Sequence, residues 1–205
     1  MIVRVAKWVV GGVAALAVGL AIRRAIKRPV MPACDESIRA VHFGGTRPAS
    51  QIRLIVLHDT EGDTAVGAAG WFANAASEGS AHVVVDQTHC YRTLPDDVIP
   101  WGAKGDRVND DGLHVEQAGY AKWSRDEWMA NRATIENAAR VAAAWADEYG
   151  IPLRFLTASD LRAMGTGARG ITTHEQITNA FDVAGGHTDP GVDYPIDYFM
   201  SLVRA

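Results

Sequence analysis

The chain has 205 residues, of which 48% are hydrophobic and 21% are charged. This length suits one ordinary globular domain with a short appendage and argues against a second full domain. The formal net charge of -4 gives no support for nucleic-acid binding, because nucleic-acid-binding domains carry an excess of lysine and arginine. The two cysteines, Cys34 and Cys90, are too few for a disulfide framework and lack the spacing of a zinc ribbon, and the sequence leaves open whether they pair.

The first thirty residues differ in character from the rest of the chain. Trp8 to Ile22 is an uncharged apolar run with basic residues on both sides. A helix that spans a bilayer needs about 20 apolar residues, so this run is short unless its flanking side chains snorkel. RRAIKR follows it, where a cleaved signal peptide would have a small-x-small site. We therefore expect residues 1–30 to form an N-terminal hydrophobic helix that anchors the chain to a membrane, with a cleaved signal as the alternative.

The next segments along the chain predict a strand, a helix and a hairpin. Residues 31–50 contain proline, glycine and mixed polarity, and we expect a linker or entry segment there. Residues 52–57 (IRLIVL) are a β-branched apolar run that ends at His58, which is typical of a buried strand. A helix is expected from Thr64 to Ala76, and a hairpin is expected to join residues 81–86 to residues 90–94.

The second half of the chain is richer in helix. Residues 112–118 (GLHVEQA) predict a further strand, and residues 125–149 predict a long helix with an apolar stripe. We expect a short helix over residues 160–164 that Ser159 caps, and a closing helix that begins near Pro195. Strands interleaved with helices indicate an α/β layered fold.

Three places along the chain carry residues suited to hydrolytic chemistry: His58, His174 and the HTDPG turn at His187–Asp189. A catalytic zinc needs three protein ligands and an open fourth position, and imidazole nitrogens and carboxylate oxygens can supply the ligands. The HExxH motif is absent, because Thr178 stands where its second histidine would be. Any metal site must therefore be assembled from distant segments, and spacing alone does not distinguish such ligands from ordinary core or surface histidines.

Several segments together resemble the N-acetylmuramoyl-L-alanine amidase type 2 family, which includes the peptidoglycan recognition proteins and many phage endolysins. The matching pieces are IVLHDTEG, SAHVVVDQTHCYRTLPDD, WGAKG, GLHVEQAGYA, THEQI and HTDPGVDYP. They occur in the family's order and cover about Arg53 to Pro195. The resemblance implies one α/β domain over residues 51–205, with a central mixed β-sheet flanked by helices and preceded here by the N-terminal hydrophobic helix.

The resemblance also implies the site residues. The metal ligands of the family fall on His58, His174 and Asp189, which would hold one zinc ion. Its acidic strand residue falls on Glu116, the general base, and His187 would hydrogen-bond the tetrahedral oxyanion. We expect the apolar neighbours of Glu116 to raise the pKa of its carboxyl group. Two alternatives stay open: His187 in place of His174 as the second ligand, and Glu116 as a solvated strand residue.

The activity implied by the resemblance is zinc-dependent peptidoglycan hydrolysis, at the amide bond between N-acetylmuramic acid and L-alanine, as in phage-type lysins. A non-catalytic peptidoglycan-binding module on the same fold is the alternative. We expect a monomer whose partners are peptidoglycan and, through its N-terminal helix, the membrane, and no nucleic acid. Catalysis would take place in the cell envelope, on the extracytoplasmic side. More basic residues follow the apolar run than precede it, which leaves the orientation of the anchor open.

The chain departs from the family pattern at two positions. Gly102 stands where many relatives carry the histidine of a WHAG motif, and Ala81 stands where some phage members have a tyrosine. Trp101 could stack on a sugar ring or belong to the core, and His82 could line the cleft or pack beneath it. Asp59 and Thr60 could orient the first ligand. We interpret the remaining histidines as surface or structural residues: His42, His89 and His114.

Overall fold

The computed structural model of the chain describes residues 29–103, 106–181 and 186–205. The expected N-terminal hydrophobic helix therefore lies outside the described residues, apart from the last two residues of its range. Within the described ranges, none of the helices is both long and apolar enough to cross a membrane.

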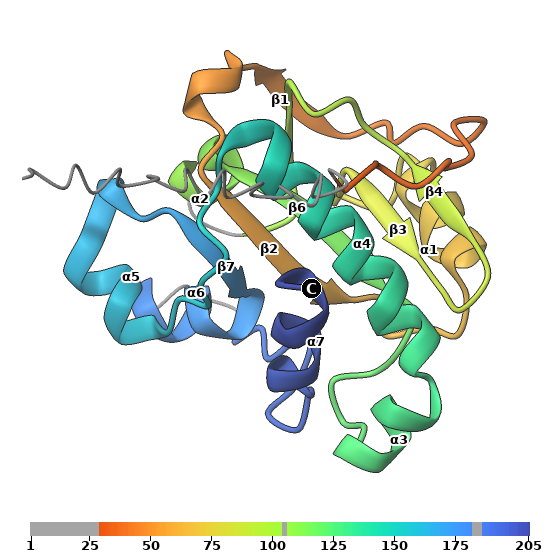
Figure 1. The fold of residues 1–205 in the computed structure, drawn as a ribbon. Helices are drawn as coiled ribbons and strands as arrows, with labels where there is room; N and C mark the ends of the chain where they lie inside the picture. Colours follow the sequence, from red (N-terminus) through yellow and green to blue (C-terminus); the bar gives the residue numbers. More distant parts are fainter. Residues whose placement is uncertain (1–28, 104–105, 182–185) are drawn as a thin grey trace, which may run out of the picture.

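A five-stranded mixed sheet forms the centre of the domain, in the order β4-β3-β6-β2-β7 (Figure 1). Its strands are β2 (Leu54–Asp59), β3 (Val83–Val85), β4 (Cys90–Arg92), β6 (Gly112–Gln117) and β7 (Gly170–Thr173). The pairs β2–β6, β2–β7 and β3–β6 are parallel, and the edge strand β4 pairs antiparallel with β3. The central mixed sheet and the β3–β4 hairpin confirm the sequence predictions.

Helices cover the sheet, and a two-stranded ribbon lies beside it. The ribbon pairs β1 (Phe43–Thr46) with β5 (Val98–Pro100). The helices are α1 (Ala65–Phe72), α2 (Asp106–Asp111), α3 (Arg125–Ala130), α4 (Arg132–Tyr149), α5 (Ala158–Met164), α6 (His174–Phe181) and α7 (Ile196–Val203), with short 3-10 turns at Ala49–Gln51 and Gly165–Gly167.

The two faces of the sheet carry different side chains. We call one the α4 face: alternate residues Ile55, Leu57, Leu113 and Val115 pack there in a core with α4 and α7, which lie in front of the sheet in Figure 1. We call the other the histidine face, because His58, His114 and Glu116 alternate with those residues and so point to the opposite side. Every residue of β2 and β6 is buried, since helices or loops cover both faces of these parallel strands.

Three sequence predictions differ from the observed elements. The long helix expected over residues 125–149 is two helices, α3 and α4, because the backbone at Asn131 leaves the helical region with φ -104° and ψ 23°. The cap of α5 is Thr157 and not Ser159: its hydroxyl accepts from Asp160 N, and the Asp160 carboxylate accepts in return from Thr157 N. The helix expected to reach Ala76 ends at Phe72, and β7 and α6 were not predicted.

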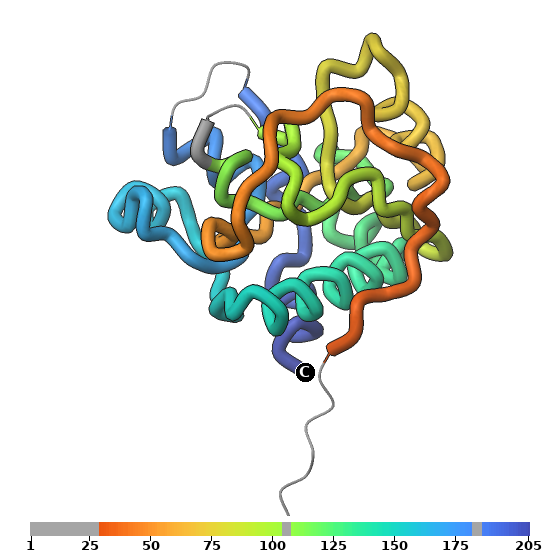
Figure 2. The backbone as a smooth tube through the Cα atoms, turned by 90° about the horizontal axis from the view of Figure 1, so that it is seen from above, coloured from red at the N-terminus to blue at the C-terminus, as the bar shows by residue number. Residues whose placement is uncertain are grey.

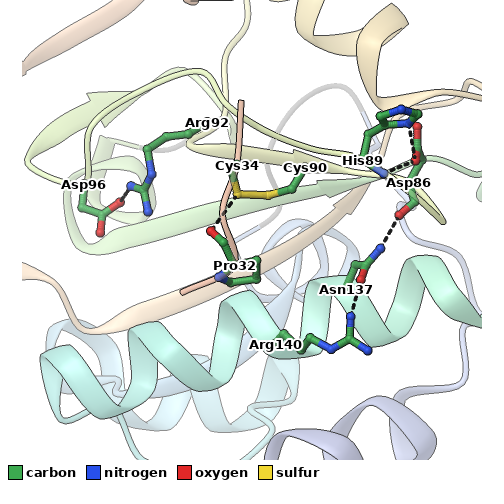
Figure 3. The surroundings of a disulfide bond; sticks show 9 residues. All are labelled: Pro32, Cys34, Asp86, His89, Cys90, Arg92, Asp96, Asn137 and Arg140. Atoms are coloured by element: carbon green, nitrogen blue, oxygen red, sulfur yellow. Dashed lines mark hydrogen bonds and ion pairs between the residues drawn. A yellow bond between two sulfur atoms is a disulfide. The ribbon is translucent and has the colours of Figure 1, made fainter. Parts of the chain in front are cut away.

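The entry segment over residues 31–50 is attached to the domain by a disulfide between Cys34 and Cys90, at the start of β4 (Figure 3). Next to it, Asp35 N donates to Cys90 O and Arg92 N donates to Asp35 O. The first described residues, Pro29 and Val30, line the same hollow as the C-terminal residues 202–205, so the two ends of the described chain lie side by side (Figure 2). The two cysteines, whose pairing the sequence left open, therefore join the entry segment to the sheet.

Candidate metal centre and active site

The residues expected to carry chemistry meet at one edge of the sheet. The parallel strands β2, β6 and β7 all end there, because parallel strands present their carboxyl ends at the same edge. His58 lies at the end of β2, and in the strand register it stands directly beside Glu116 of β6. His174 is the first residue of α6 and follows β7 without a loop. The sheet thus positions three of the five predicted site residues.

The predicted metal ligands converge on one point. His58 Nδ1 lies 2.9 Å from Asp189 Oδ2, and His174 Nδ1 lies 3.0 Å from Asp189 Oδ1. One ligand atom from each of the three residues lies within 4.8 Å of the others. Ligand atoms around a tetrahedral zinc ion stand about 3.3 Å apart; both distances to Asp189 are close to this value, so the three side chains could hold one ion.

Asp189 reaches this point on a turn that only glycine permits. Gly191 has φ +96°, and a Cβ there would lie 2.1 Å from Ala121 O. The turn is closed by a hydrogen bond from Gly191 N to Thr188 O, and Glu175 N donates to Asp189 O. The DPG sequence therefore packs against the loop after β6 and against the start of α6, which fixes Asp189 beside His174.

The electrostatics of the three ligands suit a cation. Burial acts to raise the pKa of Asp189, but its contacts with the imidazoles of His174 and His58 outweigh this effect, and the pKa lies below its ordinary value. Burial lowers the pKa of His174 and so favours the neutral imidazole, which is the form that binds metal. Two imidazole nitrogens and one carboxylate oxygen form a donor set that fits zinc.

Glu116 is a buried carboxylate beside the three ligands. Its Oε2 atom is buried and has no hydrogen-bond partner among the described residues. Burial raises the pKa of Glu116 well above its ordinary value, and the charges of Asp189 and Asp59 raise it further. The direction agrees with the expectation from its apolar neighbours. Burial likewise raises the pKa of Asp59 to about 8. Such crowded carboxylates are stabilised when a cation binds among them.

His187 lies at the rim of the same site. Its ring stacks on that of His174 with 4.2 Å between centroids, and its Nδ1 lies 3.8 Å from Asp189 Oδ1. The side chain is 42% exposed, in contrast to the buried ring of His174. The geometry therefore favours His174 as the second ligand and leaves His187 facing the solvent side, where a substrate would arrive.

An open cleft of about 780 Å³ lies over these residues. Its floor contains His58, Glu116, His174 and Asp189, and its walls include Trp101, Asn109 and residues 77–80. Trp101 is 46% exposed and stacks on His42 at 5.2 Å between ring centroids. Trp101 is therefore a wall residue, as the sugar-stacking interpretation requires, and is not part of the core.

One buried contact of His58 has no signal in the sequence. His114, interpreted from the sequence as a surface or structural residue, is fully buried, and its Nδ1 lies 2.9 Å from His58 Nε2. His82 also packs beneath the cleft: burial, and then the charge of Arg47, lowers its pKa well below the ordinary value. The Asp59 carboxylate and the Thr60 hydroxyl, expected near the ligand, bond instead to Glu61 N and Gly62 O in the following turn.

Comparison with solved structures finds the same fold in proteins that include a hydrolase and an endolysin. The hydrolase AmiA of Staphylococcus aureus, solved with its ligand, is similar with a TM-score of 0.63 and 23% identity, over 85% of this chain and 82% of that one. A mutant of PlyL gives a TM-score of 0.58 at 18% identity, over 85% and 99% of the two chains. A mutant endolysin from Bacillus subtilis gives a TM-score of 0.56 at 17% identity, over 84% of this chain and 99% of that one. At these identities the likeness establishes the fold alone.

A comparison with families extends the relationship beyond the fold. No curated protein sequence matches the chain. Residues 48–192, which include all five predicted site residues, match the N-acetylmuramoyl-L-alanine amidase family. With this match over most of its length, and with the fold and the ligand geometry described above, the chain belongs to the N-acetylmuramoyl-L-alanine amidase family.

Proposed function

We propose that the chain is a zinc-dependent amidase that cuts peptidoglycan between the lactyl group of N-acetylmuramic acid and L-alanine. One observation carries the proposal: His58, His174 and Asp189 present one ligand atom each to a common point at the base of an open cleft. The buried carboxylate of Glu116 stands beside this point. A non-catalytic binding module has no need of this combination of three ligands and a base.

The roles of the side chains follow from their positions. A zinc ion bound by the three ligands would polarise the amide carbonyl and lower the pKa of a water molecule to about 7. Glu116 accepts a proton from the attacking water, since burial has raised its pKa toward the range in which a carboxylate is an effective base. It then transfers that proton to the amine of L-alanine as the amide C–N bond breaks.

His187 has a different role at the rim. Its ring is held by stacking on His174, and it faces the cleft in which the substrate carbonyl must lie. A ring N–H there donates to the oxygen that becomes negative as water adds to the carbonyl. A donor of this kind is worth about 10²–10³ in rate. The exposed Trp101 ring in the cleft wall provides a flat apolar surface for the sugar.

We also propose a location for the enzyme, the cell envelope. The hydrophobic N-terminal segment would attach it to a membrane, and a phage-type lysin that acts as a monomer in the cell envelope fits a peptidoglycan substrate. The disulfide between Cys34 and Cys90 supports an extracytoplasmic location, because disulfides persist in oxidising compartments. Cell fractionation with and without membrane depolarisation tests this location: an enzyme found only in the cytoplasm would contradict it.

Digestion of purified sacculi with the full-length protein tests the reaction. We expect mass spectrometry to detect free stem peptides with an L-alanine amino terminus and glycan strands that keep the lactyl group. Activity should disappear in a chelator and return with zinc. A Glu116→Gln variant should bind zinc and sacculi and release about 10²–10⁴-fold less product. Binding to sacculi without release by the wild-type protein would instead favour the recognition module, and full activity of Glu116→Gln would refute the role of Glu116.

A further inference from the structure

The first metal ligand, His58, has two ring nitrogens, and they face different partners. Nδ1 faces Asp189 Oδ2 at 2.9 Å, on the side where the three ligands converge. Nε2 faces away from the cleft and lies 2.9 Å from Nδ1 of His114. The two rings come from neighbouring strands, β2 and β6, and lie nearly parallel, with an interplanar angle of 21°. Only one of the two nitrogens of a neutral imidazole carries hydrogen, so the His114 contact bears on which nitrogen of His58 can bind metal.

The second nitrogen of His114 determines the direction of this hydrogen bond. His114 Nε2 lies 3.4 Å from the carbonyl oxygen of Val108. A carbonyl oxygen can only accept, so Nε2 is the nitrogen of His114 that carries hydrogen. Nδ1 of the neutral ring is then bare and accepts from Nε2 of His58. With a metal ion bound, His58 would coordinate it through the lone pair of Nδ1 and keep its hydrogen on Nε2; without metal, the same Nδ1 faces a carboxylate oxygen of Asp189 that can only accept.

The fold holds the His114 ring in this orientation. The backbone N–H of His114 donates to His82 Nδ1 at 3.0 Å. Two glycines leave room for the ring: a Cβ on Gly102 would lie 2.4 Å from His114 Nδ1, and a Cβ on Gly112 would lie 2.9 Å from its Nε2. The slot is therefore shaped to the imidazole, and a side chain at Gly102 would displace the nitrogen that accepts from His58.

We propose that His114 is a positioning residue of the metal centre: it accepts the Nε2 hydrogen of His58, and so fixes the ring orientation and the tautomer in which Nδ1 binds the ion. The proposal rests on the metal site of the proposed function. Groups that hold a ligating histidine in this way are commonly carboxylates, carbonyls or water, and their loss costs about 10–100-fold in metal affinity or activity. In this chain a second, fully buried imidazole takes that place.

Three full-length variants test the proposal through zinc affinity, measured by competition with a chromogenic chelator. His114→Leu removes the acceptor, and we expect zinc binding to weaken about 10–100-fold. His114→Asn places an amide oxygen near the position of Nδ1, and we expect it to recover most of the affinity. Val56→Ala is the matched control, because Val56 is buried on the same face of β2 but offers His58 no hydrogen bond; its zinc affinity should equal that of the wild type.

Nitrogen-15 spectra of the histidine rings provide a readout that does not depend on activity. In the zinc-loaded wild-type protein we expect hydrogen on Nε2 of His58 and on Nε2 of His114, with His114 Nδ1 bare. A His114 ring with its hydrogen on Nδ1 there would overturn the proposal. So would wild-type zinc affinity in His114→Leu, or equal weakening in His114→Leu and His114→Asn.

Failure of the proposed function can be distinguished from failure of the role of His114. If the wild-type protein bound no zinc, the proposed function and the role of His114 would fail together. If His114→Leu did not fold, the wild-type spectra and the His114→Asn affinity would decide the question. A zinc-loaded wild type in which His114 carries its hydrogen on Nδ1 would leave the amidase intact and refute the role of His114 alone.

Discussion

The α4 face and the histidine face of the same sheet have different tasks. On the α4 face, Leu57 and Leu113 pack against α4 in a continuous apolar core. On the histidine face, one residue further along each strand, His58 and His114 form a buried polar contact that leads to the metal position. Apolar burial stabilises the fold, whereas buried polar groups cost free energy unless they are paired. Under the proposed function one face supplies stability and the other supplies chemistry, so we expect substitutions on the two faces to have separable effects.

The largest expected effect comes from the third metal ligand. Asp189→Asn keeps the shape of the side chain and removes its charge, so we expect zinc content to fall to near zero. Product release from sacculi should fall by about 10³-fold or more, because the site's electrostatic and acid–base contributions are each worth about 10²–10⁴. Elemental analysis and a sacculus-release assay measure both. Retention of one zinc per chain would show that Asp189 is not a ligand.

The next effect separates catalysis from metal binding. His187→Ala should lower kcat by about a hundredfold or more, because it removes the donor to the oxyanion, while zinc content and the unfolding midpoint stay close to the wild type. The control is His89→Ala, which removes an imidazole that is 61% exposed and outside the cleft residues. A loss of zinc in His187→Ala would instead support the alternative in which His187 is a ligand.

The reverse result is expected on the α4 face. Leu113 is fully buried and is the direct neighbour of His114 in β6. Leu113→Ala should lower the free energy of unfolding by about 2–5 kcal/mol, through lost burial and the cavity that remains. Denaturant unfolding measures this cost, and zinc affinity under conditions where the variant is folded should be unchanged. A large change in that affinity would break the separation between the two faces.

The smallest expected effect is a pH-dependent gain in stability. Burial raises the pKa of Glu116 above its usual value of 4.5, so the folded state holds this proton more tightly than the unfolded state does. Wild-type stability must therefore decrease as the pH rises from about 4.5 through the folded-state pKa. Glu116→Gln lacks this loss.

We expect the Tm of the metal-free Glu116→Gln variant to exceed that of the metal-free wild type by a few degrees at neutral pH, with the difference shrinking as the pH approaches 4.5. Calorimetry in a chelator measures both series. A Tm difference that does not change with pH would show that Glu116 is not destabilised by ionisation in the folded protein.

The sequence predicted much of the sheet and the candidate site residues. Alternating and β-branched apolar runs located β2, β6 and the β3–β4 hairpin, because period-two burial is a local pattern. The family resemblance assigned His58, Glu116, His174, His187 and Asp189, and the structure brings these five residues to one cleft. The helix cap was harder to predict from the sequence, because Ser159 and Thr157 can both cap a helix. Only the backbone at Thr157 has the extended conformation that a cap needs.

Only the tertiary structure decided which groups contact the candidate ligands from inside the fold. His114 gives no signal in the sequence, because its role depends on the register of β6 against β2 and on the space left by Gly102, a residue from a separate turn. The same holds for the pairing of Cys34 with Cys90, across a separation of 56 residues. Such contacts depend on distances between segments far apart in the chain, and a sequence pattern records only which side chains are available.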